Sequence, residues 1–260
     1  MAGDVGSEQV FIPYGASHGL AVAGCALLVA IVVALGYRLR DSAAERALRG
    51  ALASFALAFW AAYNAWWSSS SDDLANNLPL HICDFAGVIA PLALVTTNRW
   101  LRATLYFWAT TLTLQAFIQP ALHAGPALAY FWTFWISHML ILACATYDLV
   151  VRGFRPDAGD FGRAAAVTLA YLAFITPVNL WLDSNYGFVG NPPPGRSLPP
   201  MVEALGAWPG RVVIMAGLVL LGFLLALSPW LIVARRELAQ RELSQDELAA
   251  DDVSPGDSRA

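Results

Sequence analysis

The sequence contains no lysine, few charged residues of any kind and only three cysteines. Charged side chains make up 13% of the 260 residues, whereas hydrophobic residues make up 58%, and the mean hydropathy is +0.55. The fifteen basic residues are therefore all arginines, and the formal net charge is -4. This composition excludes an ordinary soluble domain, disfavours a nucleic-acid partner and predicts an integral membrane protein.

The three cysteines, Cys25, Cys83 and Cys144, lie in separate apolar segments. No two of them have the C-x-x-C spacing, and no group of cysteine and histidine has the spacing of a zinc site. The sequence therefore predicts neither a disulfide framework nor a bound metal, and the chemistry considered below requires no cofactor. Cys25 and Cys144 stand among alanine, leucine and valine, where a cysteine is usually a small hydrophobic residue.

Long apolar segments are abundant, and seven of them approach the ~20 residues that a membrane helix needs. They run over residues 19–37, 47–67, 78–96, 101–119, 127–151, 164–183 and 209–234. We therefore predict an all-α fold in which seven transmembrane helices form one domain over residues 19–234. A tail of residues 1–18 precedes this domain. An acidic tail, 235–260, follows it, with a short helix before a disordered end.

Arginines alternate between the predicted connections. The odd connections and the segment after the last helix carry Arg38, Arg40, Arg46, Arg49, Arg99, Arg102, Arg152, Arg155, Arg163, Arg235 and Arg236. The even connections are nearly free of arginine. Because basic residues are retained in cytoplasmic loops, the odd connections and the C-terminus are predicted to be cytoplasmic, and the N-terminus outside. We therefore expect a multi-pass protein of the cell membrane.

Most polar side chains within the predicted helices fall, with this orientation, in the outer half of the membrane. The candidates are His81, Cys83, Asp84, Gln115, Gln119, His138, Asn179 and Asp183. Polar residues are unfavourable inside a membrane and often mark a functional site there. They predict an outward-facing polar pocket. The two remaining histidines, His18 and His123, are interpreted as surface residues.

Helical spacing divides these candidates, because residues three or four apart share a face of a helix. Two polar stripes result: Thr111, Gln115 and Gln119, and Thr176, Asn179 and Asp183. His81 and Asp84 share a face and can pair, whereas Cys83 points elsewhere. At ~1.5 Å per residue, Cys83 lies about 7 Å and His138 about 16 Å from the outer ends of their helices. Given the uncertainty of the helix starts, the two side chains can meet.

Cys83 and His138 have two competing interpretations. A cysteine nucleophile needs a nearby base and donors for the developing oxyanion, and histidines and amides at one depth supply both. In the alternative, His81 and Asp84 form a satisfied pair near the interface and Cys83 fills space. His138 then simply hydrogen-bonds to a neighbouring helix, and Gln115 and Gln119 hold helices together.

The longest connection, "SNYGFVGNPPPGRSLPPMVEALGAWPG", lies on the same predicted side as the polar pocket. Its prolines stiffen it. Connections of this length are often functional, so it can cover the pocket as a lid, or it can merely join two helices.

Three segments resemble the YwaF-like family of bacterial integral membrane proteins. They are "LPLHICDF", "SHMLIL" and "NYGFVGNPPPGRSLPPMVEALGAWP", and the resemblance extends over nearly all seven predicted helices. That family is similar to an animal branch of seven-span acyltransferases, which move polyunsaturated acyl chains between phospholipids to make ether lipids. The resemblance implies a nucleophile at Cys83 and a histidine partner at His138. His81 and Asp84, which flank the cysteine, depart from the animal motif.

The resemblance implies a phospholipid acyltransferase or lipid hydrolase that works through a thioester on Cys83, with membrane phospholipids as its partners. Gln115, Gln119 and Asn179 are candidate oxyanion donors. The rival hypothesis is a transporter or small-ligand receptor in which His81, Asp84 and Asp183 form a proton-sensitive set. A third alternative is an assembly or scaffold protein.

Overall fold

The structure, a computed structural model, describes residues 10–69, 77–191 and 198–252. Its described residues form helices and no β-strand, which confirms the predicted all-α fold. The long helices are α1 (Ala16–Arg38), α2 (Ala43–Ser69), α4 (Ile82–Thr96), α7 (Ala129–Val150), α8 (Ala158–Leu182) and α10 (Gly210–Asp252). A composite helix consists of α5 (Arg99–Trp108), the π-helix η2 (Ala109–Thr113) and α6 (Leu114–Ile118). Two short elements, η3 (Tyr186–Phe188) and α9 (Pro200–Glu203), precede α10.

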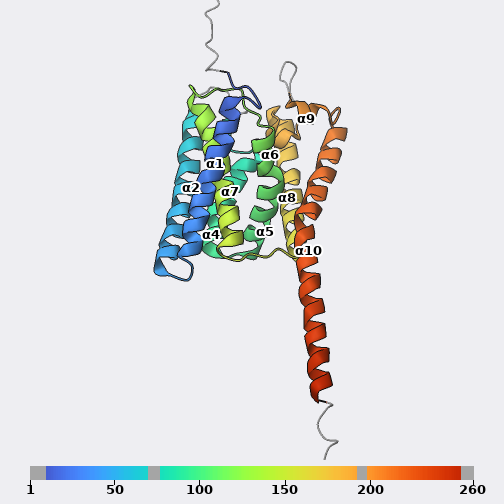
Figure 1. The fold of residues 1–260 in the computed structure, drawn as a ribbon. Helices are drawn as coiled ribbons and strands as arrows, with labels where there is room; N and C mark the ends of the chain where they lie inside the picture. Colours follow the sequence, from blue (N-terminus) through green and yellow to red (C-terminus); the bar gives the residue numbers. More distant parts are fainter. Residues whose placement is uncertain (1–9, 70–76, 192–197, 253–260) are drawn as a thin grey trace, which may run out of the picture.

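These helices form an up-and-down bundle (Figure 1). α4 packs against α2, α5 and α7, while α1 packs against α7 and α5 packs against α8. The largest cluster of buried apolar side chains joins these helices and includes Phe107, Trp108 and Tyr147. α10 lies at one edge and continues well beyond the bundle, as its red ribbon in Figure 1 shows. The short helix α4 therefore has neighbours on several sides.

Four of the described helices are long and apolar enough to cross a membrane: α1, α7, α8 and the Gly210–Arg241 part of α10. α4 is a shorter apolar helix. Each of the seven predicted intervals coincides with one of the long helices or with the composite helix. The helical regions therefore match the apolar runs of the sequence, although α10 continues to Asp252, past the predicted end at residue 234.

The start of α4 differs from the prediction, because the helix begins at Ile82 and not at residue 78. Its 15 residues give a length of ~22 Å, which is less than the ~30 Å thickness of a hydrocarbon core. The preceding residues, from Leu78 to His81, are not helical. The chain therefore enters the bundle in a non-helical conformation before α4 begins.

Side chains from distant parts of the sequence bind the backbone of this entry segment. The Leu78 N–H donates to the hydroxyl of Tyr186 at 2.9 Å, and the Tyr171 hydroxyl donates to the Leu80 carbonyl at 3.0 Å. Within a membrane, non-helical backbone is tolerated only where the protein itself satisfies its polar groups. The two tyrosines therefore explain why the segment can remain outside the helix.

The composite helix also departs from the predicted uninterrupted helix. Over Ala109–Thr113 it widens into a π-helix, a feature that often occurs at functional sites. The hydroxyl of Thr110 donates to the carbonyl of Tyr106 at 2.8 Å, and that of Thr111 to the carbonyl of Phe107. Such side-chain bonds compete with the regular ladder of the helix. The widened turn shifts the faces presented by α6.

Ion pairs between arginines and buried aspartates join the helices at the end of the bundle opposite α9. Arg102 donates to Asp148 at 2.8 Å, and Arg99 donates to Asp160 at 2.9 Å. The two aspartates are 2% and 0% exposed. The guanidinium carbons of Arg102 and Arg99 also lie over the ring of Phe154, at 4.7 and 5.5 Å from its centroid, respectively. These pairs hold α5 against α7 and α8.

Three further arginines lie at the same end. Arg49 of α2 and Arg152 after α7 both donate to the carbonyl of Leu94 in α4, at 3.0 and 2.6 Å. Arg155 pairs with Glu237 of α10 at 2.8 Å. The arginine-rich connections and the segment after the apolar part of α10 therefore meet at one end of the bundle.

Candidate functional site

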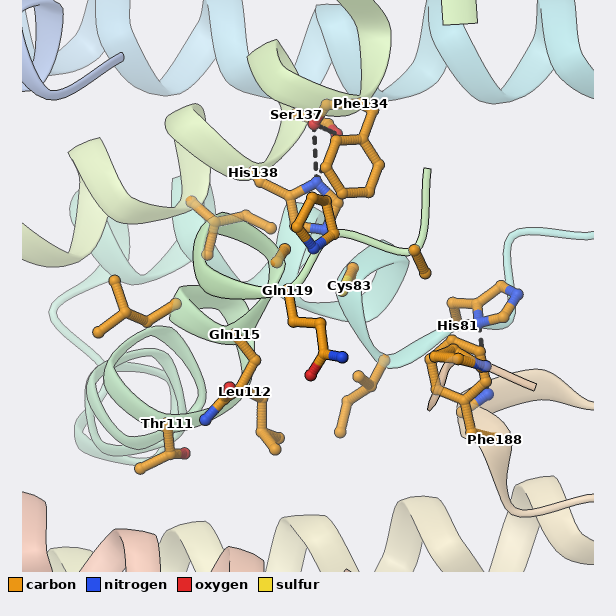
Figure 2. A pocket seen from close by; sticks show the side chains of 18 of the residues that line it. His81, Cys83, Thr111, Leu112, Gln115, Gln119, Phe134, Ser137, His138 and Phe188 are labelled. Carbon is orange, nitrogen blue, oxygen red and sulfur yellow. Dashed lines mark hydrogen bonds between the residues drawn. The ribbon is translucent and has the colours of Figure 1, made fainter. Parts of the chain in front are cut away.

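A cavity of about 1140 Å³ lies within the bundle, between α2, α4, the composite helix, α7 and α10. This volume is slightly above the usual range for ligand pockets, about 300–1,000 Å³. Six of the predicted site residues line it: His81, Cys83, Asp84, Gln115, Gln119 and His138. Figure 2 shows several of these side chains around the common space.

Cys83 is the second residue of α4, and it lines the cavity with a half-buried side chain. It is a free cysteine. The first N–H groups of a helix have no intrahelical partner, and with the helix dipole they stabilise an anion placed beside them. The late start of α4 therefore puts the cysteine beside N–H groups that favour a thiolate, while burial, which removes hydration, and the neighbouring carboxylate of Asp84 oppose the charge.

His138 lies within α7, and its ring is fixed by its own helix. Its Nδ1 lies 2.7 Å from the carbonyl oxygen of Phe134. Since a carbonyl can only accept, Nδ1 carries the proton in the neutral ring, and Nε2 carries the lone pair. The side chain is 8% exposed and reaches the cavity beside Gln119 (Figure 2). His138 therefore presents a nitrogen base to the same cavity as Cys83.

In His81 the proton and the lone pair are on the opposite ring nitrogens from those in His138. The N–H of Gly187 donates to its Nδ1 at 3.3 Å, so that Nδ1 carries the lone pair and Nε2 the proton. Its ring packs against Tyr186 and Phe188, at centroid distances of 5.1 and 5.9 Å. In Figure 2 it lies beside Phe188, apart from His138. The lone pair of His81 therefore already accepts a hydrogen bond from the outer connection, the segment between α8 and α10.

Asp84 interacts with His81, but not through the imidazole. Its carboxylate accepts the backbone N–H of His81 at 2.9 Å, as an acidic residue in the first turn of a helix commonly does. The predicted pairing of the two residues therefore occurs between carboxylate and backbone, because the His81 ring is turned towards Gly187. Asp84 also lines the cavity.

The stripe of Thr111, Gln115 and Gln119 reaches the cavity as a group. Gln119 caps the C-terminus of α6, and in Figure 2 its side chain extends into the common space with the amide directed away from His138. Gln115 lies one turn earlier, near Leu112. An amide N–H donor near a reacting carbonyl can stabilise an oxyanion. Both amides therefore line the same cavity as Cys83.

The second stripe is not brought to the cavity. Asn179 and Asp183 are absent from its lining among the described residues. Asp183 is exposed at the end of α8, where it adopts a left-handed conformation with φ of 51°. Asn179 is buried, and its amide binds the loop that follows. Asn179 therefore stabilises the connection between α8 and α10, and its amide is not positioned to donate to an oxyanion in the cavity.

Asn179→Leu is expected to lower the free energy of unfolding by about 3 kcal/mol or more, because three buried hydrogen bonds are lost. The Asn179 oxygen accepts from the Ser184 hydroxyl at 3.0 Å and from the Tyr186 N–H at 2.7 Å, and its NH₂ donates to the Tyr186 carbonyl at 2.9 Å. Thermal unfolding in detergent, followed by tryptophan fluorescence, measures the change.

The matched control is Thr176→Val, one turn away on the same predicted stripe. The Thr176 hydroxyl bonds only to the Leu172 carbonyl of its own helix, so a change below about 1 kcal/mol is expected. Equal unfolding temperatures for the two variants would contradict the role given to Asn179.

Comparison with known protein families identifies the family of this chain. The sequence model of the TMEM164 family matches residues 13–227, which include Cys83, His138 and the first part of α10, as far as Leu227. The chain belongs to the TMEM164 family. This is a family of membrane proteins, in agreement with the apolar helices described above. Neither a curated protein nor a solved structure matches the chain.

In this TMEM164 family member, His18 corrects a prediction. It is not a surface residue, since only 5% of it is exposed. Its Nδ1 accepts the Tyr14 N–H at 2.9 Å, and its Nε2 lies 2.9 Å from the Phe117 carbonyl. The sequence offered no sign of these partners, because Phe117 is distant along the chain. His18 fastens the start of α1 to the composite helix.

Some residues of the TMEM164 cavity were missed. Tyr63, Tyr130 and Ser137 line it beside the predicted residues. The conformation of Gly187 was also unforeseen: its φ is +64°, and a Cβ there would lie 2.7 Å from the Tyr171 hydroxyl. Among the residues that the structure describes, no group of three or more histidine, cysteine or acidic side chains has a metal-binding arrangement.

Proposed function

We propose that this TMEM164 family member is a phospholipid acyltransferase or lipid hydrolase with Cys83 as nucleophile and His138 as general base. One observation carries the proposal. A free cysteine at the start of a helix and a histidine with an unshared Nε2 lone pair line one large cavity. That combination is what nucleophilic catalysis by a thiol requires. We also propose that the chain is related to the YwaF-like bacterial membrane proteins.

The membrane placement is part of the same proposal. All seven helical passes cross the membrane, and the arginine-rich end, where Arg49 and Arg152 bind the carbonyl of Leu94, faces the cytoplasm. The cell membrane is then the location, and the outer ends of the helices hold Cys83 and Gln119. Lipid ester groups lie near the edge of the hydrocarbon core. The polar end of the cavity is therefore at the depth of the bonds that the enzyme would cleave.

In the first half-reaction, Nε2 of His138 takes the proton from the Cys83 thiol while the sulfur attacks the carbonyl carbon of a phospholipid ester. A tetrahedral intermediate forms, and its oxyanion is stabilised by the amides of Gln115 and Gln119 and by N–H groups at the start of α4. The intermediate collapses as the C–O bond breaks. The leaving alkoxide takes the proton from His138 and departs as lysolipid, so the acyl group remains on Cys83 as a thioester.

In the second half-reaction, an acceptor hydroxyl takes the place of the lysolipid. His138 removes its proton, and the oxygen attacks the thioester carbonyl. The C–S bond breaks, the thiolate of Cys83 recovers the proton from His138, and the new ester leaves. A lysolipid hydroxyl as acceptor gives acyl transfer, whereas water gives hydrolysis. Because the site is largely buried, a base in contact with the cavity is needed whenever the thiol loses its proton.

The proposal is tested with full-length protein in nanodiscs that contain phospholipid and a labelled lysolipid. Mass spectrometry of the lipids is expected to show lysolipid release and acyl exchange. Mass spectrometry of the rapidly quenched protein is expected to show an acyl group on the peptide that contains Cys83, removable by hydroxylamine. Solute binding in the absence of both products would instead favour the transporter or receptor hypothesis.

A further inference from the structure

One face of α10 continues the cavity far from Cys83. Its cavity-lining residues are Met215, Leu218, Val219, Gly222, Leu225, Ala226 and Pro229. They recur at the three- and four-residue spacing of a helix face. From Met215 to Pro229 this stripe is ~21 Å long at ~1.5 Å per residue, longer than the ~15 Å of one hydrocarbon leaflet. The α10 wall is therefore long enough for a whole lipid acyl chain.

The opposite wall consists of the π-helix and its neighbours. Thr110, Thr111 and Leu114 line the cavity there. Both threonine hydroxyls are bonded to carbonyls of their own helix, so they present methyl groups without unpaired donors. At the inner end, the Tyr106 hydroxyl donates to the Ala226 carbonyl at 2.8 Å and accepts from the Trp230 indole at 2.9 Å. The walls are therefore apolar, and the polar groups at the floor are satisfied.

The cavity is open sideways between these two walls. Leu114 on one side, and Leu218 and Leu225 on the other, line the cavity and are still 42%, 50% and 63% exposed. α10 is anchored on a different face by Phe223, whose ring centroid lies 5.0 Å from that of Phe107. Across the seam between η2 and α10, Gly222 of α10 lies against Thr111 of η2, and the hydrogen bonds of the Tyr106 hydroxyl join α5 to α10 at the inner end.

Gly222 of α10 lies directly against Thr111 of η2 across the seam. A Cβ at this position would lie 3.1 Å from Cγ2 of Thr111, tighter than an ordinary contact. Any larger side chain must therefore displace Thr111 or project into the seam. Gly217, one and a half turns away, has open space around its Cα and does not line the cavity.

We propose that the acyl chain of the substrate lipid enters sideways between η2 and α10 and lies along the Met215–Pro229 stripe, and that Gly222 opposite Thr111 determines which chain lengths are accepted. This inference rests on the proposed function, because the chain is positioned by its carbonyl carbon at Cys83. The polar end of the cavity holds the ester, and the apolar seam holds the hydrocarbon. An acyl chain suits both parts, since it carries no polar group beyond its carbonyl.

The first test locates the chain without requiring turnover. A palmityl chloromethyl ketone with a diazirine at the far end of the chain is reacted with the full-length protein, so that Cys83 displaces chloride and becomes alkylated. After irradiation, the far end is expected to be attached to residues of η2 or to α10 between Leu218 and Pro229. Attachment to α2 or α7 overturns the chain path, and failure to alkylate Cys83 overturns the path and the proposed function together.

The second test compares Gly222→Leu with Gly217→Leu, a matched pair in the same helix. The ratio of alkylation rates for palmityl and hexyl chloromethyl ketones is expected to fall about tenfold in Gly222→Leu, equivalent to ~1.4 kcal/mol. It should stay within about twofold in Gly217→Leu, because that position faces away from the seam. An unchanged ratio in Gly222→Leu, or an equal fall in both variants, overturns the role of Gly222.

The two proposals fail in different ways. If the tethered chain occupies the seam but no lysolipid appears in the nanodisc assay, the acyltransferase proposal fails and the chain site stands. If acyl exchange proceeds with the same chain preference in Gly222→Leu as in the unaltered protein, the enzyme stands and the proposed selectivity of Gly222 is wrong.

Discussion

Cys83→Ser is expected to lower the rate of acyl transfer by about 10³-fold or more, as removal of a nucleophile does in enzymes that form covalent intermediates. A serine hydroxyl is similar in size but much harder to deprotonate than a thiol, and His138 is a single neutral base. The initial rate of lysolipid release at saturating phospholipid measures the loss. The acyl adduct on the peptide that contains residue 83 should disappear as well.

The control for this variant is Cys25→Ser. The Cys25 thiol donates to the carbonyl of Trp135 at 3.9 Å, and a serine hydroxyl can make the same bond, so activity is expected within about twofold of the original. Unaltered activity in a folded Cys83→Ser protein would remove Cys83 from the mechanism. Loss of activity in Cys25→Ser alone would point to another thiol.

His138→Asn is expected to reduce the turnover rate by about 10²–10⁴-fold, the usual contribution of a general base. An asparagine amide can still donate to the Phe134 carbonyl in place of Nδ1, so the local packing should be kept. What it cannot replace is the Nε2 lone pair. The expected signature is a fall in kcat with little change in KM, because the base acts on the thiol and not on lipid binding.

His123→Asn is the matched control, because His123 lies at the cavity edge with an exposed side chain. Its activity should remain within about twofold of the unaltered protein. A second comparison concerns His81, whose Nδ1 already accepts the Gly187 N–H. Full activity in His138→Asn together with its loss in His81→Asn would transfer the role of base to His81.

The positions of the helices were predictable, because long apolar runs must be buried in lipid or protein whatever their neighbours. The start of α4 was not. "LPLHI" is apolar enough to continue a helix, and only Tyr171 and Tyr186, about a hundred residues later in the chain, supply the bonds that keep it non-helical. The sequence of this segment alone does not reveal such distant partners.

The candidate site was predicted in part. The depths of Cys83 and His138 followed from counting residues along each helix, and both line the cavity. Asn179 was predicted to line the pocket, because the sequence does not distinguish a buried amide that binds a substrate from one that binds a loop. The outcome depends on Tyr186, whose backbone takes two of the three bonds of that amide. The depth of Cys83 and His138 was therefore predictable, but the partner of Asn179 was not.

The stripe on α10 could not be recognised from sequence for a different reason. Leucine, valine and glycine at helical spacing are equally suited to face lipid, a neighbouring helix or a cavity. Only the position of η2 distinguishes these cases, since Thr111 lies against Gly222 and leaves a space on either side. The residue pattern of a helix alone does not distinguish a face that lines a cavity from a face that contacts lipid.

The π-helix at Ala109–Thr113 has a final consequence for how the amides are presented. A π-turn is equivalent to one additional residue in an α-helix. The wide turn takes up this residue locally, so that α6 keeps the face that a regular helix one residue shorter would give it. A regular α-helix of the full length would instead turn Gln115 and Gln119 by about 100° from their present direction relative to α5. The direction of these two amides therefore depends on a turn that precedes them and not on their own identities.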